Sequence, residues 1–294
     1  MMVNEKRRIL DKAELTTYVF EPNDKKKRPA LLICPGGGYI DTTPNEGECV
    51  ALEFVNRGFE CFVLDYSTYK RNKEGVFYPQ PLMEVAESLR TIRKNAEEWF
   101  VDPEKIFLLG FSAGGNLIAN YGNRWRAFLK EDEKEEDLKT KGLVLCYAAY
   151  DWERQIRDLG GNSRDVEMGF INGDPNKMIE TKKMVEKANE AMFHTGTPSI
   201  QQLREVSPLY SVNEDTPPCF LWHTVSDDMV SVNQVYDYVR VLNDHHIPHE
   251  LHVFYKGHHG LSLANEMSAT KEKNIVPLVN QWVDLAAMWL SEQI

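Results

Sequence analysis

The stretch from Ile106 to Asn116 constrains the fold more than any other part of this 294-residue chain. A short apolar run ends in Gly-Phe-Ser-Ala-Gly at residues 110–114, and a segment compatible with a helix follows at once. In this setting, Gly-x-Ser-x-Gly is typical of a strand, a sharp turn and a helix, with the serine at the apex. Side chains at the two outer glycines would crowd the strand against the helix. We therefore expect Ser112 to present its hydroxyl at the end of a strand, with the amide of Ala113 facing the same space.

Strand-like and helix-like segments alternate along most of the chain. Apolar runs typical of buried strands occupy residues 30–34, 60–66, 106–111, 142–147 and 218–223, after an earlier strand at 14–21 and before a last strand at 250–255. Helical spacing of apolar residues predicts helices at 46–57, 79–99, 113–125, 232–242 and 278–290. This alternation predicts an α/β fold with a mostly parallel central sheet and helices on both faces. Since no linker or repeat divides the chain, we expect one domain over residues 1–294.

The alternation breaks between Asp151 and Pro208, where the sequence suggests no clear strand. A helix from Glu180 to Phe193 is predicted there, with Met184, Ala188 and Met192 on one side. Segments of this length inside a compact domain are usually lids or binding elements. We expect residues 151–208 to form a helical cap or lid insertion whose methionines supply an adaptable apolar wall. The alternative is a structural excursion that does not contact substrate.

Charge excludes several classes of partner. The chain carries 34 basic and 45 acidic residues, a net charge of −11. Nucleic acids and anionic membranes attract basic surfaces, so neither is expected as a partner. No apolar run reaches the length of about 18 residues that a membrane span needs. The first residues become charged before an apolar core develops, which does not resemble a secretory signal. We therefore expect a cytoplasmic protein.

The cysteines and most of the histidines do not suggest a metal site. Five cysteines are widely spaced, most of them within or beside apolar runs, and no Cys-x-x-Cys pair occurs: Cys34, Cys49, Cys61, Cys146 and Cys219. They fit the role of small buried apolar residues. A histidine cluster at residues 245, 246, 249 and 252 crosses a helix end, a loop and a strand, so its side chains cannot share one face. His223 is interpreted as a packed residue at a strand end. We expect no metal and no cofactor.

Polar clusters follow several of the predicted strands. They are the glycines at 36–38, Ser112, the aspartates at 227 and 228, and the histidines at 258 and 259. Ligands of open parallel sheets bind beyond the carboxyl ends of the strands, and the order Ser, Asp, His is that of a nucleophile, an acid and a base on such a sheet. Histidine can take the serine proton, a carboxylate can fix the imidazole, and backbone amides can stabilise an oxyanion. Adjacent loop residues point in different directions, so one aspartate and one histidine should serve, and the pattern leaves open which.

Several motifs together resemble the acetyl-esterase and acetylxylan-esterase branch of the α/β-hydrolases, near the hormone-sensitive-lipase-like esterases. They are Cys-Pro-Gly-Gly-Gly-Tyr, Tyr-Pro-Gln-Pro-Leu, Gly-Phe-Ser-Ala-Gly-Gly-Asn, Phe-Leu-Trp-His-Thr and His-Gly-Leu-Ser-Leu-Ala, and the resemblance runs from about Ala30 onward. The resemblance implies the α/β-hydrolase fold with Ser112 as nucleophile. It implies Asp227 as the acid, within Asp-x-x-Val, and His259 as the base, within His-Gly-Leu. It also implies three oxyanion donors, the amides of Gly37, Gly38 and Ala113.

The chain departs from this family at two positions and in one segment. Pro35 stands where the lipase-like relatives carry a histidine, and Ser231 replaces the usual proline after Val230. The 151–208 segment is longer than in many relatives, so the pocket that it contributes is expected to be particular to this chain.

The predicted function is that of a serine carboxylesterase acting through an acyl-enzyme. The expected substrate is a small-molecule ester with a short acyl group, acetyl above all, on an alcohol or a sugar, and an acetylated carbohydrate is one candidate. The same groups could cleave an amide, as in an arylformamidase or a peptidase-like member. A catalytically silent binding protein on the same fold is the alternative from another class. The sequence does not indicate the oligomeric state.

Overall fold

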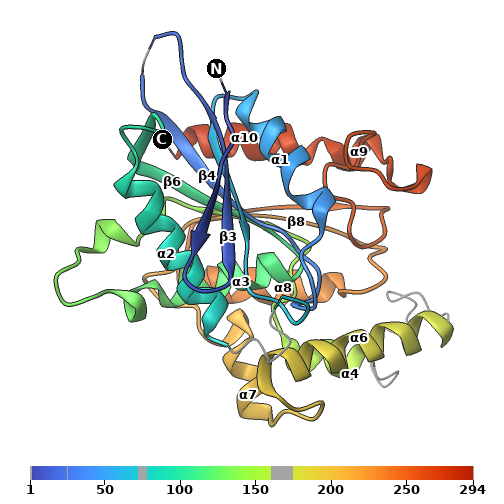
Figure 1. Ribbon diagram of the computed structural model, residues 1–294. Coiled ribbons are helices and arrows are strands. Elements are labelled where there is room, and N and C mark those ends of the chain that lie inside the picture. The colour runs from blue at the N-terminus through green and yellow to red at the C-terminus, as the bar shows by residue number, and fades with distance from the viewer. Residues whose placement is uncertain (1, 25, 72–77, 160–174, 294) are drawn as a thin grey trace.

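The fold is described from a computed structural model that covers residues 2–24, 26–71, 78–159 and 175–293. Within these residues, nine strands form one sheet, in the order β1-β3-β5-β4-β6-β7-β8-β9, with β2 paired to β3 (Figure 1). The strands are β1 (Met2–Val3), β2 (Lys6–Ile9), β3 (Ala13–Phe20), β4 (Arg28–Cys34), β5 (Glu60–Asp65), β6 (Val101–Phe111), β7 (Leu143–Cys146), β8 (Cys219–Thr224) and β9 (His249–Phe254). The neighbouring pairs β5-β4, β4-β6, β6-β7, β7-β8 and β8-β9 are parallel. β3 pairs antiparallel with β1, β2 and β5. The predicted, mostly parallel sheet is confirmed.

Helices cover both faces of the sheet (Figure 1). On one face lie α2 (Gln80–Lys94), α3 (Ala113–Arg124) and α8 (Val232–Asp244), whose inner residues share a core with Leu32, Leu108 and Leu221. On the other face lie α1 (Glu48–Val55) and α10 (Trp282–Glu292), packed against Ile33 and Leu109. The alternate side chains of each central strand therefore enter two separate apolar cores, as a sheet buried on both faces requires.

The turn between β6 and α3 is as tight as the glycine pattern predicts. A Cβ atom placed on Gly110 would lie 2.4 Å from the carbonyl oxygen of Gly114, and one on Gly114 would lie 2.0 Å from the carbonyl oxygen of Cys34. Neither position has room for a side chain. At the apex, Ser112 has φ 50° and ψ −114°, a conformation that residues with side chains seldom adopt. The strand, sharp turn and helix expected around Ser112 are present.

Three helices occupy the described parts of the 151–208 segment. They are α4 (Trp152–Leu159), α6 (Pro175–Phe193) and α7 (Ile200–Glu205), followed by the short helix η4 (Pro208–Tyr210). Figure 1 shows α4, α6 and α7 grouped together away from α1 and α10. The indole N–H of Trp152 on α4 donates to Asn189 on α6 at 2.8 Å, which ties the two helices together. Residues 160–174 lie outside the described residues, and the role of the segment as a lid stays a prediction.

The remaining elements are small. They are η1 (Pro44–Glu46), η2 (Trp125–Phe128), η3 (Glu135–Asp137), η5 (Glu272–Asn274) and α9 (Pro277–Asn280). In the part of the chain that the structure describes, no helix combines the length and the apolar character needed to cross a membrane.

Candidate active site

Three of the predicted residues form a hydrogen-bonded series at the carboxyl edge of the sheet. Nε2 of His259 lies 2.8 Å from Oγ of Ser112, and Nδ1 of His259 lies 2.8 Å from Oδ2 of Asp227. With Nδ1–H donating to the carboxylate, Nε2 carries a lone pair that accepts the hydroxyl proton of Ser112. Asp227 and the His259 side chain are 1% and 8% exposed, so water competes little for these bonds. The arrangement can move a proton from the serine to the imidazole.

The backbone holds Asp227 in place for this contact. Its Oδ1 accepts the N–H groups of Met229 and Val230 at 2.9 and 2.8 Å, which leaves Oδ2 to His259. These bonds arise because the chain turns sharply after β8, before Ser231 caps α8 by accepting the N–H of Asn233. Ser231, the departure from the family pattern, thus serves as the helix N-cap.

The neighbouring aspartate and histidine make other contacts. Asp228 accepts the backbone N–H of His259 at 3.0 Å, so it fixes the loop rather than the imidazole ring. Nδ1–H of His258 donates to the carbonyl of His259 at 2.7 Å. The alternatives left open by the sequence are therefore placed differently in space, and only Asp227 and His259 align with Ser112.

The electrostatics of the three residues agree with this geometry. Burial acts to lower the pKa of His259, but the Asp227 carboxylate beside the ring, assisted by Glu46 and Asp228, holds that pKa above its usual value. Burial acts in the opposite sense on Asp227, where the contact with His259 and the proximity of His223 keep the pKa of the carboxyl below its usual value. The pair therefore favours a charged carboxylate that stabilises an imidazolium when one forms.

The glycine loop after β4 lies against Ser112. Gly38 and Ala113 line the same cavity as Ser112 and His259. Gly37 has φ 121°, and a Cβ atom there would lie 2.0 Å from the carbonyl oxygen of Asp41, so the position requires glycine. Within the described residues, the N–H groups of Gly37 and Gly38 make no backbone hydrogen bond. Gly38 lines the cavity beside Ser112, whereas Gly37 is not among the residues that line it.

The cavity beside Ser112 has a volume of about 30 Å³ and an apolar wall. The segment between β7 and β8 supplies much of that wall. The lining residues besides Gly38, Ser112, Ala113 and His259 are Ala149, Trp152, Gln155, Met184, Val185, Ala188, Met229 and Val230. Met184 reaches the glycine loop, because a Cβ atom on Gly38 would lie 3.7 Å from its Cε. Of the residues expected to form the apolar wall, Met184 and Ala188 line the cavity, whereas Met192 is buried in the core and does not line it.

Three buried polar residues surround the series: His223, which the sequence analysis interpreted as a packed residue, and Glu46 and Tyr147, which it did not single out. His223 is buried and lies 3.4 Å from Asp227, with its Nε2 3.0 Å from the carbonyl oxygen of Val230, and burial lowers its pKa. Glu46 and Tyr147 are also buried and bond to each other at 2.7 Å. A single glutamate before an amphipathic helix and a tyrosine at a strand end carry no distinctive signal, so only the fold reveals them.

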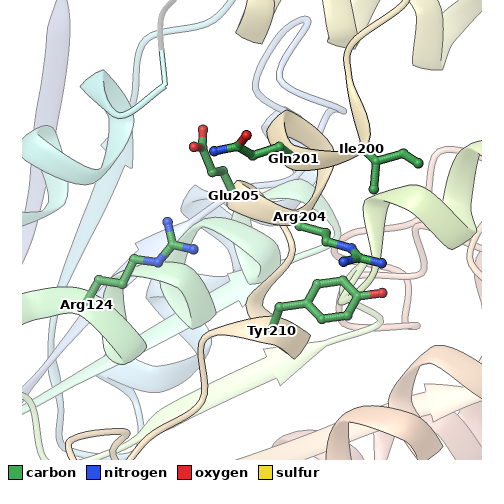
Figure 2. A pocket seen from close by; sticks show the side chains of 6 residues that line it. All are labelled: Arg124, Ile200, Gln201, Arg204, Glu205 and Tyr210. Atoms are coloured by element: carbon green, nitrogen blue, oxygen red, sulfur yellow. The ribbon is translucent and has the colours of Figure 1, made fainter.

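A second hollow of about 400 Å³ is formed by α7, the end of α3 and η4, and its lining residues are Arg124, Ile200, Gln201, Arg204, Glu205 and Tyr210 (Figure 2). The guanidinium of Arg204 lies over the ring of Tyr210, 5.2 Å from its centre. None of the residues of the serine series lines this hollow. Across the described ranges, no cluster of three or more side chains is arranged to hold a metal ion.

Known proteins resemble this chain over most of its length. The BD-FAE family matches residues 18–242. Endo-1,4-beta-xylanase B of Butyrivibrio fibrisolvens is 30% identical over 249 residues, which are 85% of this chain and 35% of that protein. The chain spans about a third to a half of the length of the first curated relatives that it matches.

Two solved structures match almost the entire chain. A sugar hydrolase (YeeB) from Lactococcus lactis is 30% identical with a TM-score of 0.75, and the match covers 99% of this chain and 98% of that one. An alpha/beta hydrolase enzyme from a Medee basin deep-sea metagenome library is 29% identical with a TM-score of 0.71, and the match covers the same shares. The α/β-hydrolase fold predicted from the sequence is confirmed.

Proposed function

Because the chain belongs to the BD-FAE family, and with it to the esterase-like α/β-hydrolases that its motifs resemble, we propose that it is a serine carboxylesterase that removes short acyl groups. The observation that carries the proposal is the hydrogen-bonded series from Ser112 through His259 to Asp227, with both contacts at 2.8 Å. A serine in this setting is activated as a nucleophile, which a protein that only binds its ligand does not need.

The reaction begins when Ser112 attacks the ester carbonyl carbon while Nε2 of His259 takes the hydroxyl proton. Asp227 stabilises the resulting imidazolium and keeps the ring in its orientation. The amides of Ala113, Gly37 and Gly38 donate to the tetrahedral oxyanion. His259 then gives its proton to the leaving alcohol, and an acyl-enzyme forms on Ser112. A water molecule, deprotonated by His259, releases the acid by the same steps in reverse order.

The small cavity supports the preference for a short acyl group. Its volume is about 30 Å³, whereas one water molecule needs about 10–15 Å³ by this measure. An acetyl group therefore fits between Ser112 and the side chains of Met184 and Val185, and a long acyl chain would have to displace them. This wall belongs to the 151–208 segment, which we propose acts as the cap of the acyl pocket.

The leaving group is proposed to be an alcohol or a sugar hydroxyl. The relative named as a xylanase and the structure named as a sugar hydrolase support a carbohydrate ester, and an acetylated sugar is the candidate substrate. An amide hydrolase would use the same groups, and no feature of the site favours it.

The test compares wild type with Ser112→Ala on p-nitrophenyl acetate and measures labelling by a fluorophosphonate probe. We expect the substitution to abolish both turnover and labelling. Turnover by Ser112→Ala at the wild-type rate would contradict the serine mechanism. A panel of acetylated sugars, simple acyl esters and N-formyl amides then separates the substrate classes, and amides turned over faster than esters would replace the proposal with the amide hydrolase.

A further inference from the structure

A buried carboxylate, Glu46, lies beside the proposed active site and takes no direct part in the proposed reaction. The residue is 2% exposed and ends η1, the short helix that follows the glycine loop. Its Oε2 accepts the N–H of Gly36 at 2.7 Å, and its Oε1 accepts the hydroxyl of Tyr147 at 2.7 Å. Both carboxylate oxygens are therefore engaged, each by a different segment of the chain.

The bond to Gly36 fixes the loop that carries the proposed oxyanion donors. A Cβ atom on Gly36 would lie 2.8 Å from Oε2 of Glu46 and 2.9 Å from Cβ of Ser112, so the residue lies between the carboxylate and the nucleophile. Gly37 and Gly38 follow directly. Any movement of the carboxylate would therefore shift these amides relative to Ser112.

The bond to Tyr147 reaches the loop that carries His259. The tyrosine hydroxyl accepts the backbone N–H of Ser262 at 2.9 Å, three residues after His259. The tyrosine ring packs edge-on against the imidazole, with ring centres 5.0 Å apart and an angle of 70°. Ser262 also donates its hydroxyl to the carbonyl of Asn45, next to Glu46. One buried group thus connects the glycine loop, the end of β7 and the histidine loop.

The charge of Glu46 has no permanent cation beside it among the described residues. No lysine or arginine is among the described groups that shift the pKa of Glu46, and the charge that acts on this pKa is that of His259. The titratable groups around Glu46 are His259, Tyr66, Tyr147, Cys49 and Cys146. Burial is the largest cause of the raised pKa values of the two tyrosines and the two cysteines. His259 in turn faces Asp227, Asp228, Glu46 and His223. In this set, the imidazole is the group whose charge changes during the proposed reaction.

We propose that Glu46 is a positioning residue and a second carboxylate for His259. It holds the glycine loop after β4 and the loop that carries His259 in fixed positions relative to each other, and it stabilises the imidazolium. This inference rests on the proposed function, because it assigns Glu46 to that reaction. Burial raises the pKa of Glu46, and the two hydrogen bonds at 2.7 Å oppose that effect by favouring the charged form.

The test uses Glu46→Gln, which keeps the shape of the side chain and removes its charge. The rate of Ser112 labelling by an alkyl fluorophosphonate is followed across the pH range in which His259 titrates. Loss of the carboxylate should lower the pKa of His259, so the acid limb moves to lower pH. The plateau rate should fall roughly tenfold, less than after the loss of a whole oxyanion donor. A role in folding alone would lower the rate without moving the limb.

Glu84→Gln is the matched control. Glu84 is likewise buried and accepts the N–H of Ser67 at 2.7 Å, but its contacts are with Ser67 and Gln80. We expect its acid limb and plateau to equal those of wild type. A Glu46→Gln protein that folds and keeps the acid limb of the wild type would overturn the proposal for Glu46 alone. If the wild-type protein does not react with the probe, the proposed function is wrong, and this inference falls with it.

If Glu46→Gln does not fold, Tyr147→Phe tests the same connection. It keeps the ring against His259 and removes only the hydroxyl that bridges Glu46 and Ser262. The plateau labelling rate should fall several-fold, and a folded Tyr147→Phe protein that is labelled at the wild-type rate would overturn the proposal.

Discussion

Nε2 of His259 lies 2.8 Å from Oγ of Ser112, although 147 positions separate the two residues in the chain. The contact forms because β6 and β9 run parallel in one sheet, so the loops that follow them emerge at the same edge. β7 and β8 lie between the two strands, and Asp227 enters from the loop after β8 to complete the series. The position of each residue thus follows from the strand order.

The two aspartates should differ sharply in their effect on activity. Asp227→Asn removes the acceptor that fixes the imidazole, so kcat on p-nitrophenyl acetate should fall by roughly 10³–10⁴. Asp228→Asn keeps an oxygen that can accept the His259 amide, and kcat should stay within about threefold of wild type. Steady-state kinetics on both proteins checks this, and an equal loss in the two would contradict the assignment of Asp227 as the acid.

Activity should depend on pH through His259. The base must be neutral to accept the serine proton, so kcat/KM should fall as pH drops through the pKa of this residue. Burial alone would lower that pKa, but the Asp227 carboxylate holds it above the ordinary value of 6.5. The acid limb of the kcat/KM profile should therefore be centred above that value. A limb centred below it would show that burial outweighs the carboxylates.

The side chain of Met184 should limit the length of the acyl group. Met184→Ala would enlarge the cavity beside Gly38, so the ratio of butyrate to acetate ester turnover should rise by about tenfold. Met288 on α10 offers a control, since it is 58% exposed and outside the cavity, and Met288→Ala should leave the ratio unchanged. An unchanged ratio in Met184→Ala would mean that another group closes the pocket.

Backbone strain at Ser112 should appear as a difference in stability between two inactive variants. Ser112→Gly and Ser112→Ala both lose the hydroxyl, but only glycine adopts φ 50° and ψ −114° without strain. Such strain costs on the order of 1–3 kcal/mol, and the greater freedom of glycine when unfolded offsets about 0.5–1 kcal/mol of the relief. The glycine variant should therefore be the more stable by about 1 kcal/mol in urea unfolding. A more stable alanine variant would contradict this.

Most of the fold could be predicted because its central strands are buried on both faces. Residues 30–34, 61–64 and 106–111 contain no polar side chain, and such runs identify central parallel strands. β1 and β2 were not predicted, because β1 has only two residues and β2 reads Lys-Arg-Arg-Ile, which has no apolar pattern. The predicted C-terminal helix was wrong in one respect. The single helix expected over residues 278–290 is divided into α9 and α10, and Leu278 in α9 is 57% exposed.

Those residues of the candidate site that belong to recognisable motifs could be predicted from the sequence. Ser112, Asp227 and His259 lie in loops that follow predicted strands, in the order that this type of site requires. The choice between Asp227 and Asp228 needed the resemblance, since the two are adjacent and chemically identical. Glu46 and Tyr147 could not be found in this way: their contact joins residues 101 positions apart, and each is unremarkable in its own segment.

His259, the proposed base, lies in the loop after β9, the outermost strand of the parallel part of the sheet. β9 pairs with β8 and with no other described strand, whereas β6, which delivers the nucleophile, is flanked by β4 and β7. A transient detachment of this edge would withdraw His259 while the central strands and their two cores stayed intact. On gradual heating, turnover should then cease before the far-ultraviolet circular dichroism signal collapses. Amide hydrogens in β9 should exchange with deuterium sooner than those in β6. Heat inactivation of the enzyme would thus begin at the edge strand β9 and not in the two apolar cores.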